Sequence, residues 1–153
     1  MARLHESIVV PVSTEVAFDY VARFETTAEW DPGIREARAL FEGLPEVGSE
    51  FELTSVFAGQ ESVLRYVIRV LDRPHELVIE GMGDKVHAVD TIRFSPAGSG
   101  TRIDYTASIS LKGFASLAEP LLYPLLVRMG RKAVAGLKRT LEGGAGGRSA
   151  KAS

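Results

Sequence analysis

Three residues of this chain carry side chains that general acid–base chemistry uses: Asp90, Tyr66 and Tyr105. Each lies in a stretch where apolar and polar residues alternate, the pattern of a strand with one buried face. Ile92 and Phe94 share the face of Asp90, so a carboxylate there would be buried, and burial raises its pKa toward the range of a general base. A tyrosine hydroxyl on the same face could donate a hydrogen bond to a ligand carbonyl. These three residues are therefore the candidate catalytic residues.

Each candidate also has a plainer interpretation, which the sequence leaves open. Asp90 could lie at the rim of the sheet, or a bulge could turn it outward, because one extra residue in a strand reverses every face beyond it. The two tyrosines could be core aromatics whose hydroxyls find local partners.

Other kinds of active site find little support in the sequence. There is no cysteine, and the three histidines, His5, His75 and His87, lack a metal-ligand spacing such as HExxH. We therefore expect no metal and no cofactor. A GxSxG nucleophile motif is also missing, and the Gly98–Gly100 segment lies between two strand-like stretches, without the strand-to-helix context of a phosphate loop.

The candidates belong to a chain in which strands outnumber helices. After a first strand, helical spacing over Val16–Val21 and a stretch at about Thr26–Trp30 predict two short helices, and a long apolar helix closes the chain at Phe114–Leu141. Short links rich in turn formers join the strands, as in antiparallel neighbours. We expect an α+β fold with seven strands: Leu4–Val10, Ile34–Glu42, Ser49–Ala58, Gln60–Leu71, Glu76–Met82, Val86–Phe94 and Thr101–Leu111.

The long helix predicts a cavity. Its apolar stripe must lie against the sheet, and a curved sheet wrapped on a straight helix tends to leave a gap. Alternation along the strands puts Val70 on the inner face together with the residues that we expect around the gap. These are Leu64, Tyr66, Ile68, Leu77, Ile79, Asp90, Ile92, Ile103, Tyr105 and Ala107 on the strands, and Leu122, Leu126 and Met129 on the helix.

Charge is unevenly distributed along the chain. Residues 112–153 hold eight Lys or Arg and two Asp or Glu, whereas the whole chain holds 18 and 20. The basic residues of the long helix form either a patch for anionic lipid or a solvated helix face, and we favour the solvated face. No aromatic residues are interleaved with them, so we expect no nucleic-acid binding. These residues are Arg128, Arg131, Lys132, Lys138 and Arg139.

Two further features bear on location. The most apolar run, FASLAEPLLYPLLV, is shorter than the ~18 residues that span a bilayer and contains Glu119 and two prolines. The start, MARLHESIVV, lacks the pattern of a secretory signal. We therefore expect a cytoplasmic protein, and keep open both contact with a membrane surface and homodimerisation.

Four segments carry a resemblance to a known superfamily: IVVPVSTEVAFDYVARFETTAEWDPGIREA, GSEF, TIRFSPAGSGTRIDYTASISLKG and GRKAVAGLKRTLE. With the order of the elements, they resemble the SRPBCC, or START-like (Bet v 1-like), superfamily, and within it the polyketide cyclase/dehydrase and lipid transport group. The resemblance implies a single helix-grip domain over residues 1–142 and a deep apolar cavity. Residues 143–153 are rich in Gly, Ala and Ser, and this composition predicts a disordered tail. The resemblance also places Trp30 near the cavity mouth, where its side chain would either contact the ligand or only pack against neighbouring residues.

The leading hypothesis is that the cavity binds a hydrophobic or amphipathic small molecule, such as a lipid, polyketide or isoprenoid. One alternative is a polyketide cyclase or dehydratase that uses Asp90 as base and a cavity tyrosine as hydrogen-bond donor. Another is a lipid carrier that docks on membranes through the basic helix. Fold resemblance does not choose between these functions.

Overall fold

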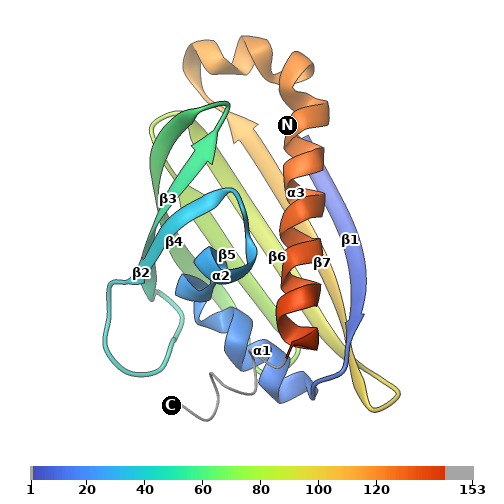
Figure 1. Ribbon diagram of the computed structural model, residues 1–153. Helices are drawn as coiled ribbons and strands as arrows, with labels where there is room; N and C mark the ends of the chain where they lie inside the picture. The colour runs from blue at the N-terminus through green and yellow to red at the C-terminus, as the bar shows by residue number, and fades with distance from the viewer. Residues whose placement is uncertain (1, 144–153) are drawn as a thin grey trace.

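Seven antiparallel strands form one sheet that curves around a long C-terminal helix (Figure 1). The computed structural model describes residues 2–143, apart from the side chains of residues 114 and 115. Along the sheet the strands follow the order β1-β7-β6-β5-β4-β3-β2, and this arrangement confirms the predicted α+β helix-grip fold. Their bounds are β1 (Ala2–Val10), β2 (Ile34–Ala39), β3 (Glu50–Phe57), β4 (Gln60–Asp72), β5 (Glu76–Met82), β6 (Val86–Ala97) and β7 (Gly100–Leu111).

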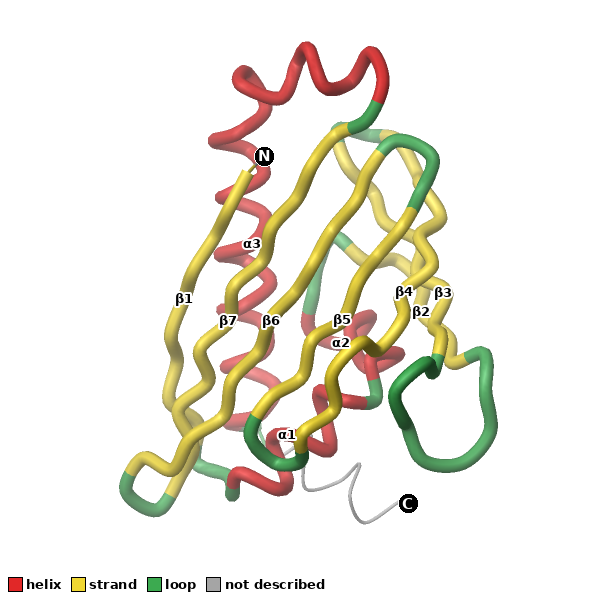
Figure 2. Tube along the Cα trace, turned by 180° about the vertical axis from the view of Figure 1, so that it is seen from behind, coloured by secondary structure: helices red, strands yellow, loops and turns green. Residues whose placement is uncertain are grey.

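Short helices close the lower end of the sheet in the views of Figures 1 and 2. They are α1 (Thr14–Ala22), a single 3₁₀ turn η1 (Phe24–Thr26) and α2 (Thr27–Trp30). Ser13 caps α1, because its hydroxyl oxygen accepts a hydrogen bond from the Val16 backbone N–H at 3.2 Å. The predicted pair of short helices after the first strand is therefore present.

The C-terminal helix starts later than the sequence predicts. A 3₁₀ helix, η2 (Gly113–Ala118), comes first, and α3 (Glu119–Glu142) follows it. Pro120 lies in the first turn of α3, where a missing backbone N–H leaves no hydrogen bond unmade, so a proline favours a helix start at this point. The predicted tail lies outside the described residues from 144 onward. No helix among the described residues is long and apolar enough to cross a bilayer.

The lower half of the space between sheet and helices is solidly filled. Phe18 of α1 packs edge-on against Phe94 of β6, with ring centroids 5.2 Å apart, and Phe24 of η1 packs on Phe51 of β3 at 6.1 Å. Leu137 of α3 is fully buried among them. Such close packing of aromatic and aliphatic side chains is the main source of the domain's stability.

One predicted face is wrong. Val70 is 37% exposed, whereas the alternation of β4 placed it inside. The pairing of β4 with β5 shifts between Ile68 and Val70, so an irregularity adds a residue and reverses the faces beyond it. Leu71 packs against the core in place of Val70.

Two glycines bring α3 close to its neighbours. A Cβ on Gly136 would lie 1.9 Å from the backbone carbonyl oxygen of Trp30, at the end of α2. A Cβ on Gly130 would lie 2.2 Å from a methyl carbon of Leu4 on β1. The helix can approach this closely only because neither position has a side chain.

Replacing Gly136 with alanine should destabilise the protein. The new methyl group would overlap a backbone carbonyl, and overpacking of this kind costs about 1–3 kcal/mol, which exceeds the roughly 1 kcal/mol that alanine gains over glycine in a helix. Urea unfolding should show a net loss of up to about 2 kcal/mol. Gly143→Ala is the control, since its Cβ would come no closer than 3.4 Å to another atom. Equal stability of Gly136→Ala and wild type would show that α3 is not held at this contact.

An acid and tyrosine cluster in an apolar cavity

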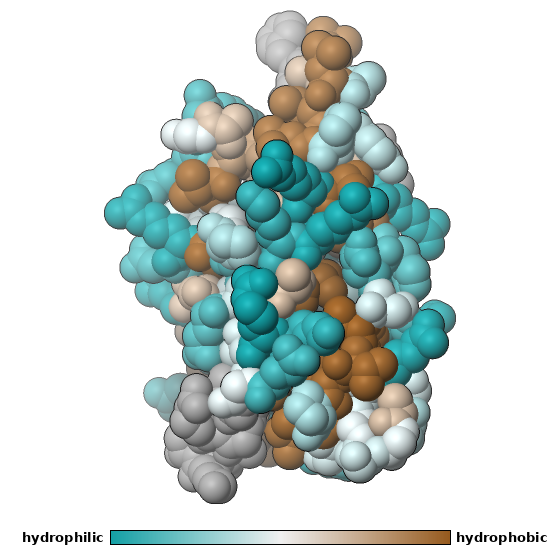
Figure 3. All heavy atoms as spheres, turned by 45° about the vertical axis from the view of Figure 1, so that its right-hand side comes forward, coloured by the Kyte–Doolittle hydropathy of each residue, from teal (hydrophilic) through white to brown (hydrophobic). Residues whose placement is uncertain are grey.

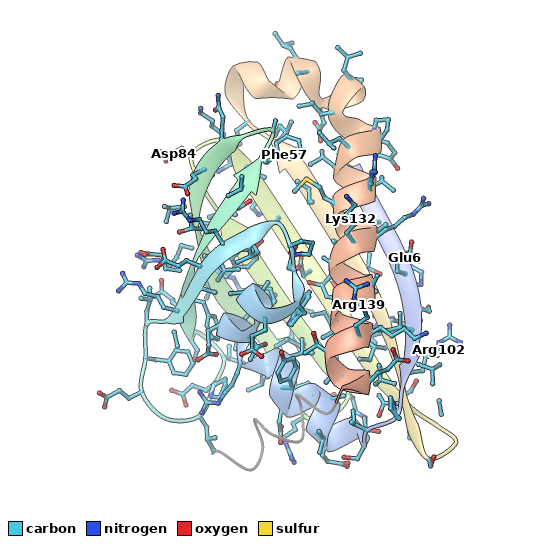
Figure 4. All side chains as sticks on the ribbon, viewed as in Figure 1. Glu6, Phe57, Asp84, Arg102, Lys132 and Arg139 are labelled. Atoms are coloured by element: carbon cyan, nitrogen blue, oxygen red, sulfur yellow. The ribbon has the colours of Figure 1, made fainter. Side chains whose placement is uncertain are left out.

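A cavity of about 400 Å³ lies between the upper half of the sheet and the first half of α3. Its upper rim includes Phe57 and Ala58 at the β3–β4 turn and Lys85 before β6, and Figure 4 shows Phe57 and Asp84 at this end of the sheet. Leu4, Leu64, Val86, Ile109, Leu111 and six residues of α3 supply much of the wall. Those six are Leu122, Leu126, Met129, Gly130, Ala133 and Val134, and none of them carries a charge.

The predicted cavity residues divide into two groups. The first group lies on the wall: Leu64, Tyr66, Asp90, Tyr105, Ala107, Leu122, Leu126 and Met129. The second group is buried in the filled lower half and is not part of the wall: Trp30, Ile68, Leu77, Ile79, Ile92 and Ile103. Both groups share the inner face of the sheet, but α1, η1 and α2 occupy the space next to the second group.

Asp90 lies at the inner end of the cavity. It is 8% exposed and points inward from β6, opposite Ala107 of β7. Tyr105, two residues before Ala107 on the same face, donates a hydrogen bond from its hydroxyl to Asp90 Oδ2. Burial raises the pKa of Asp90 to about 7, against the lowering effect of this hydrogen bond and with a further rise from the charge of Asp31.

Tyr66 completes the tyrosine pair from β4. Its ring lies across β5 at Gly81, where a Cβ would fall 2.5 Å from the ring carbon Cζ. It also packs on Phe24, with ring centroids 5.0 Å apart. Burial and the nearby carboxylates hold the pKa of both Tyr66 and Tyr105 well above its usual value, so both hydroxyls keep their protons and can donate hydrogen bonds.

Trp30 packs against the cluster of Asp90, Tyr66 and Tyr105 through its contact with Tyr105. Its ring meets Tyr105 edge-on at a centroid distance of 6.3 Å, and its backbone carbonyl meets α3 at Gly136. The indole Nε1 is buried and has no hydrogen-bond partner among the described residues. Trp30 is therefore a packing residue behind the cavity wall.

Asp31 is a wall residue that the sequence did not single out as functional. It ends α2, and its Oδ1 accepts a hydrogen bond from the Gly33 backbone N–H at 2.8 Å. Burial raises its pKa to about 6, partly offset by that hydrogen bond. In the sequence Asp31 precedes Pro32 and Gly33, and a turn accounts for an aspartate there just as well. Only its position directly after the buried Trp30 could have indicated an inward carboxylate.

The outer face of α3 carries the predicted basic residues away from the cavity. Figure 4 shows Lys132 and Arg139 on the side of the helix that faces away from the sheet. Arg131 pairs with Glu6 of β1 at 3.2 Å, and Lys138 with Glu142 at 3.9 Å. Within residues 2–143, no group of three His, Asp or Glu side chains could hold a metal ion.

The buried Asp90 should make stability fall as the pH rises. Between pH 4 and 7 the folded protein holds a proton on Asp90, pKa about 7, that the unfolded chain, pKa 3.8, has released. The free energy of unfolding therefore decreases across this range. Asp90→Asn removes this loss, so the variant should be more stable than wild type by a few kcal/mol at pH 8 and nearly equal to it at pH 4, as measured by urea unfolding.

Asp104→Asn is the matched control. Hydrogen bonds from Ser7 and Arg102 lower the pKa of Asp104, so its loss should destabilise the protein at pH 8, with the opposite sign. An Asp90→Asn variant that is less stable than wild type at pH 8 would contradict the assigned burial of this carboxylate.

Comparison with known proteins identifies the family of this chain. No curated protein matches its sequence. The solved structures that share its fold include three of low sequence identity to this chain. TTHA0849 from Thermus thermophilus is 17% identical, with a TM-score of 0.76 over 91% of this chain and 96% of that one. The Zhui aromatase/cyclase from Streptomyces sp. R1128 is 14% identical, with a TM-score of 0.76 over 94% of each chain.

A START superfamily protein from Mycobacterium smegmatis is 19% identical, with a TM-score of 0.72 over 94% of this chain and 96% of that one. Residues 1–142 match the family described as polyketide cyclase / dehydrase and lipid transport. The match covers nearly the whole chain. The chain therefore belongs to the polyketide cyclase / dehydrase and lipid transport family.

Proposed function

We propose that the protein binds a hydrophobic or amphipathic small molecule in the cavity between the sheet and α3. The observation that carries this proposal is a cavity of about 400 Å³ with mostly apolar walls and a polar cluster at its inner end. This volume lies in the range of small-molecule sites, roughly 300–1,000 Å³. An apolar ligand body would bury surface against Leu64, Leu126 and Met129, and a polar group would reach the carboxyls and tyrosines.

Lipid transport would be one form of this function. The large apolar side chains Leu117, Leu121, Tyr123 and Leu125 are exposed on η2 and the first turns of α3, with Leu121 85% exposed. Figure 3 shows apolar side chains gathered on this upper end of the helix. Leu122, next to Leu121 in the sequence, lines the cavity. Exposed apolar side chains beside a cavity-lining residue would suit contact with a lipid surface.

A second candidate function is catalysis of the polyketide cyclase type. One of the similar structures, Zhui, is named as an aromatase/cyclase. The observation in its favour is that Asp90, Tyr66 and Tyr105 meet on one part of the cavity wall. In this mechanism the carboxylate of Asp90 takes a proton from a methylene between two carbonyls, and Tyr66 donates a hydrogen bond to the carbonyl oxygen that becomes negative. The carbanion attacks a second carbonyl of the same chain, and the new alkoxide takes the proton back from Asp90.

Filling the cavity should abolish binding. Ala107 lies on the wall, and Ala107→Phe would place a ring in the hollow. Fluorescence titration with an environment-sensitive naphthalene probe should show binding to wild type and at least about tenfold weaker binding to the variant, because an occupied cavity offers no apolar surface. Met129→Trp fills the cavity from α3 and serves as a second variant if Ala107→Phe folds poorly.

Ala135→Phe is the matched control, since Ala135 is exposed on α3 and adds the same ring outside the cavity. It should bind the probe like wild type. If both cavity-filling variants bind the probe as tightly as wild type, the ligand is not in this cavity and the proposed function is wrong.

For the catalytic candidate, Asp90→Asn should lower turnover of a linear poly-β-ketone thioester by about a hundredfold to ten-thousandfold, the usual contribution of a general base. Binding of the same substrate should stay within a few fold, because asparagine keeps the shape of the side chain. Cyclised product is measured by chromatography, and Asp104→Asn on the outer face of the sheet is the control. Turnover by Asp90→Asn at the wild-type rate would remove this mechanism.

A further inference from the structure

The polar end of the cavity holds two carboxyl groups and no nearby cation among the described residues. Asp31 reaches it from the end of α2 and Asp90 from β6. Both residues line the same cavity, and the charge on Asp31 adds to the rise in the pKa of Asp90. Each keeps one carboxyl oxygen outside its described hydrogen bond: Oδ2 of Asp31 and Oδ1 of Asp90.

The rest of the described wall does not compensate for these two charges. The wall residues from β1, β2, β3 and α3 are uncharged, and Tyr66 and Tyr105 face the carboxyls as neutral donors. Lys85 is the one cationic residue on the described wall, and it lies at the rim, five residues before Asp90. At about 3.3 Å per residue along the strand, its Cα is about 16 Å from that of Asp90.

From this placement we infer that the ligand carries a cationic amine, which pairs with Asp31 and Asp90 while an apolar body fills the remainder of the cavity. The inference rests on the proposed function and names the chemical class of its ligand. An ammonium group would supply the charge that the wall lacks, and it has donors for both free carboxyl oxygens.

The inference predicts a direction for the dependence of affinity on pH. In the empty protein the carboxyls hold protons at pH 5, since their pKa values are raised to about 6 and about 7. An ammonium ion favours the ionised forms, so binding releases protons and tightens as the pH rises toward 8. A neutral carbonyl ligand would accept a hydrogen bond from a protonated carboxyl, and its affinity would weaken over the same range.

The test compares three probes with the same aromatic body: naphthylethylamine, naphthylethanol and naphthylacetone. Isothermal titration calorimetry with the full-length protein at pH 5 and pH 8 gives each dissociation constant. At pH 8 the amine should bind about tenfold to a hundredfold tighter than the alcohol, the gain expected of a charge-assisted hydrogen bond. Its affinity should rise at least about tenfold from pH 5 to pH 8, while that of the alcohol changes little. Titrations in two buffers of different ionisation enthalpy should show protons released on amine binding.

Asp31→Asn and Asp90→Asn test the two carboxyls separately, since asparagine keeps the shape and removes the charge. Either change should bring the amine to within about threefold of the alcohol at pH 8, because it removes a charge that favours the amine. Asp84→Asn is the control, because Asp84 is exposed at the β5–β6 turn, at the upper end of the sheet (Figure 4). It should keep the wild-type preference for the amine.

The outcomes separate the inference from the proposed function. If the alcohol or the ketone binds at pH 8 as tightly as the amine, or if the affinity for the amine does not depend on pH, the inference is wrong while ligand binding stands. If no probe binds at either pH, the proposed function is wrong and the inference is lost with it. An amine preference that survives both asparagine variants would place the cation elsewhere and overturn the assignment to Asp31 and Asp90.

Discussion

The contact between α3 and the backbone of Trp30 at Gly136 determines where the molecule is solid and where it is hollow. At this point the helix is held against α2. Below it, the side chains of α1, η1 and α2 fill the space between the concave face of the sheet and α3. Above it no further helix of the described chain enters the space between the strands and α3, and the cavity occupies that half. The same contact places Asp31, the residue after Trp30, at the boundary between filled core and open cavity. Fold and site therefore depend on one close approach between two backbones.

Burial at the cavity raises the pKa values of Asp31 and Asp90. Two carboxyls that lose water without gaining a cation are destabilising, and the protein limits this cost by raising their pKa values. Tyr105 supplies one hydrogen bond to Asp90, and the Gly33 backbone N–H supplies one to Asp31. A ligand that satisfied the remaining oxygens would remove much of this cost, so the features that destabilise the empty protein are those that would favour occupancy. Stability given up at a polar cluster of this kind is typical of a site shaped for binding or chemistry.

Much of the fold could be predicted from alternation and turn residues, because a strand with one buried face leaves a clear period of two. Face assignments for Leu64, Tyr66, Asp90 and Tyr105 follow from that pattern, and these four residues lie on the cavity wall. Alternation assigns a face but not a height along the strand, so Ile68 and Ile103 could not be distinguished from the wall residues above them. The irregularity before Val70 leaves no clear mark in the residue types. Asp31 shows a different limit, since a turn accounts for its residue type, and its inward position follows only from the docking of α2 on α3.

Locating a bound molecule by NMR tests the central claim most directly. With methyl-labelled protein and naphthylethanol as the neutral probe, intermolecular nuclear Overhauser effects would identify the side chains that touch it. We expect contacts to Leu64, Leu126 and Met129 on the cavity wall. Contacts confined to Leu117 and Leu121, which are exposed outside the cavity, would contradict the account, because the probe would then lie on the surface and the hollow would be empty of ligand.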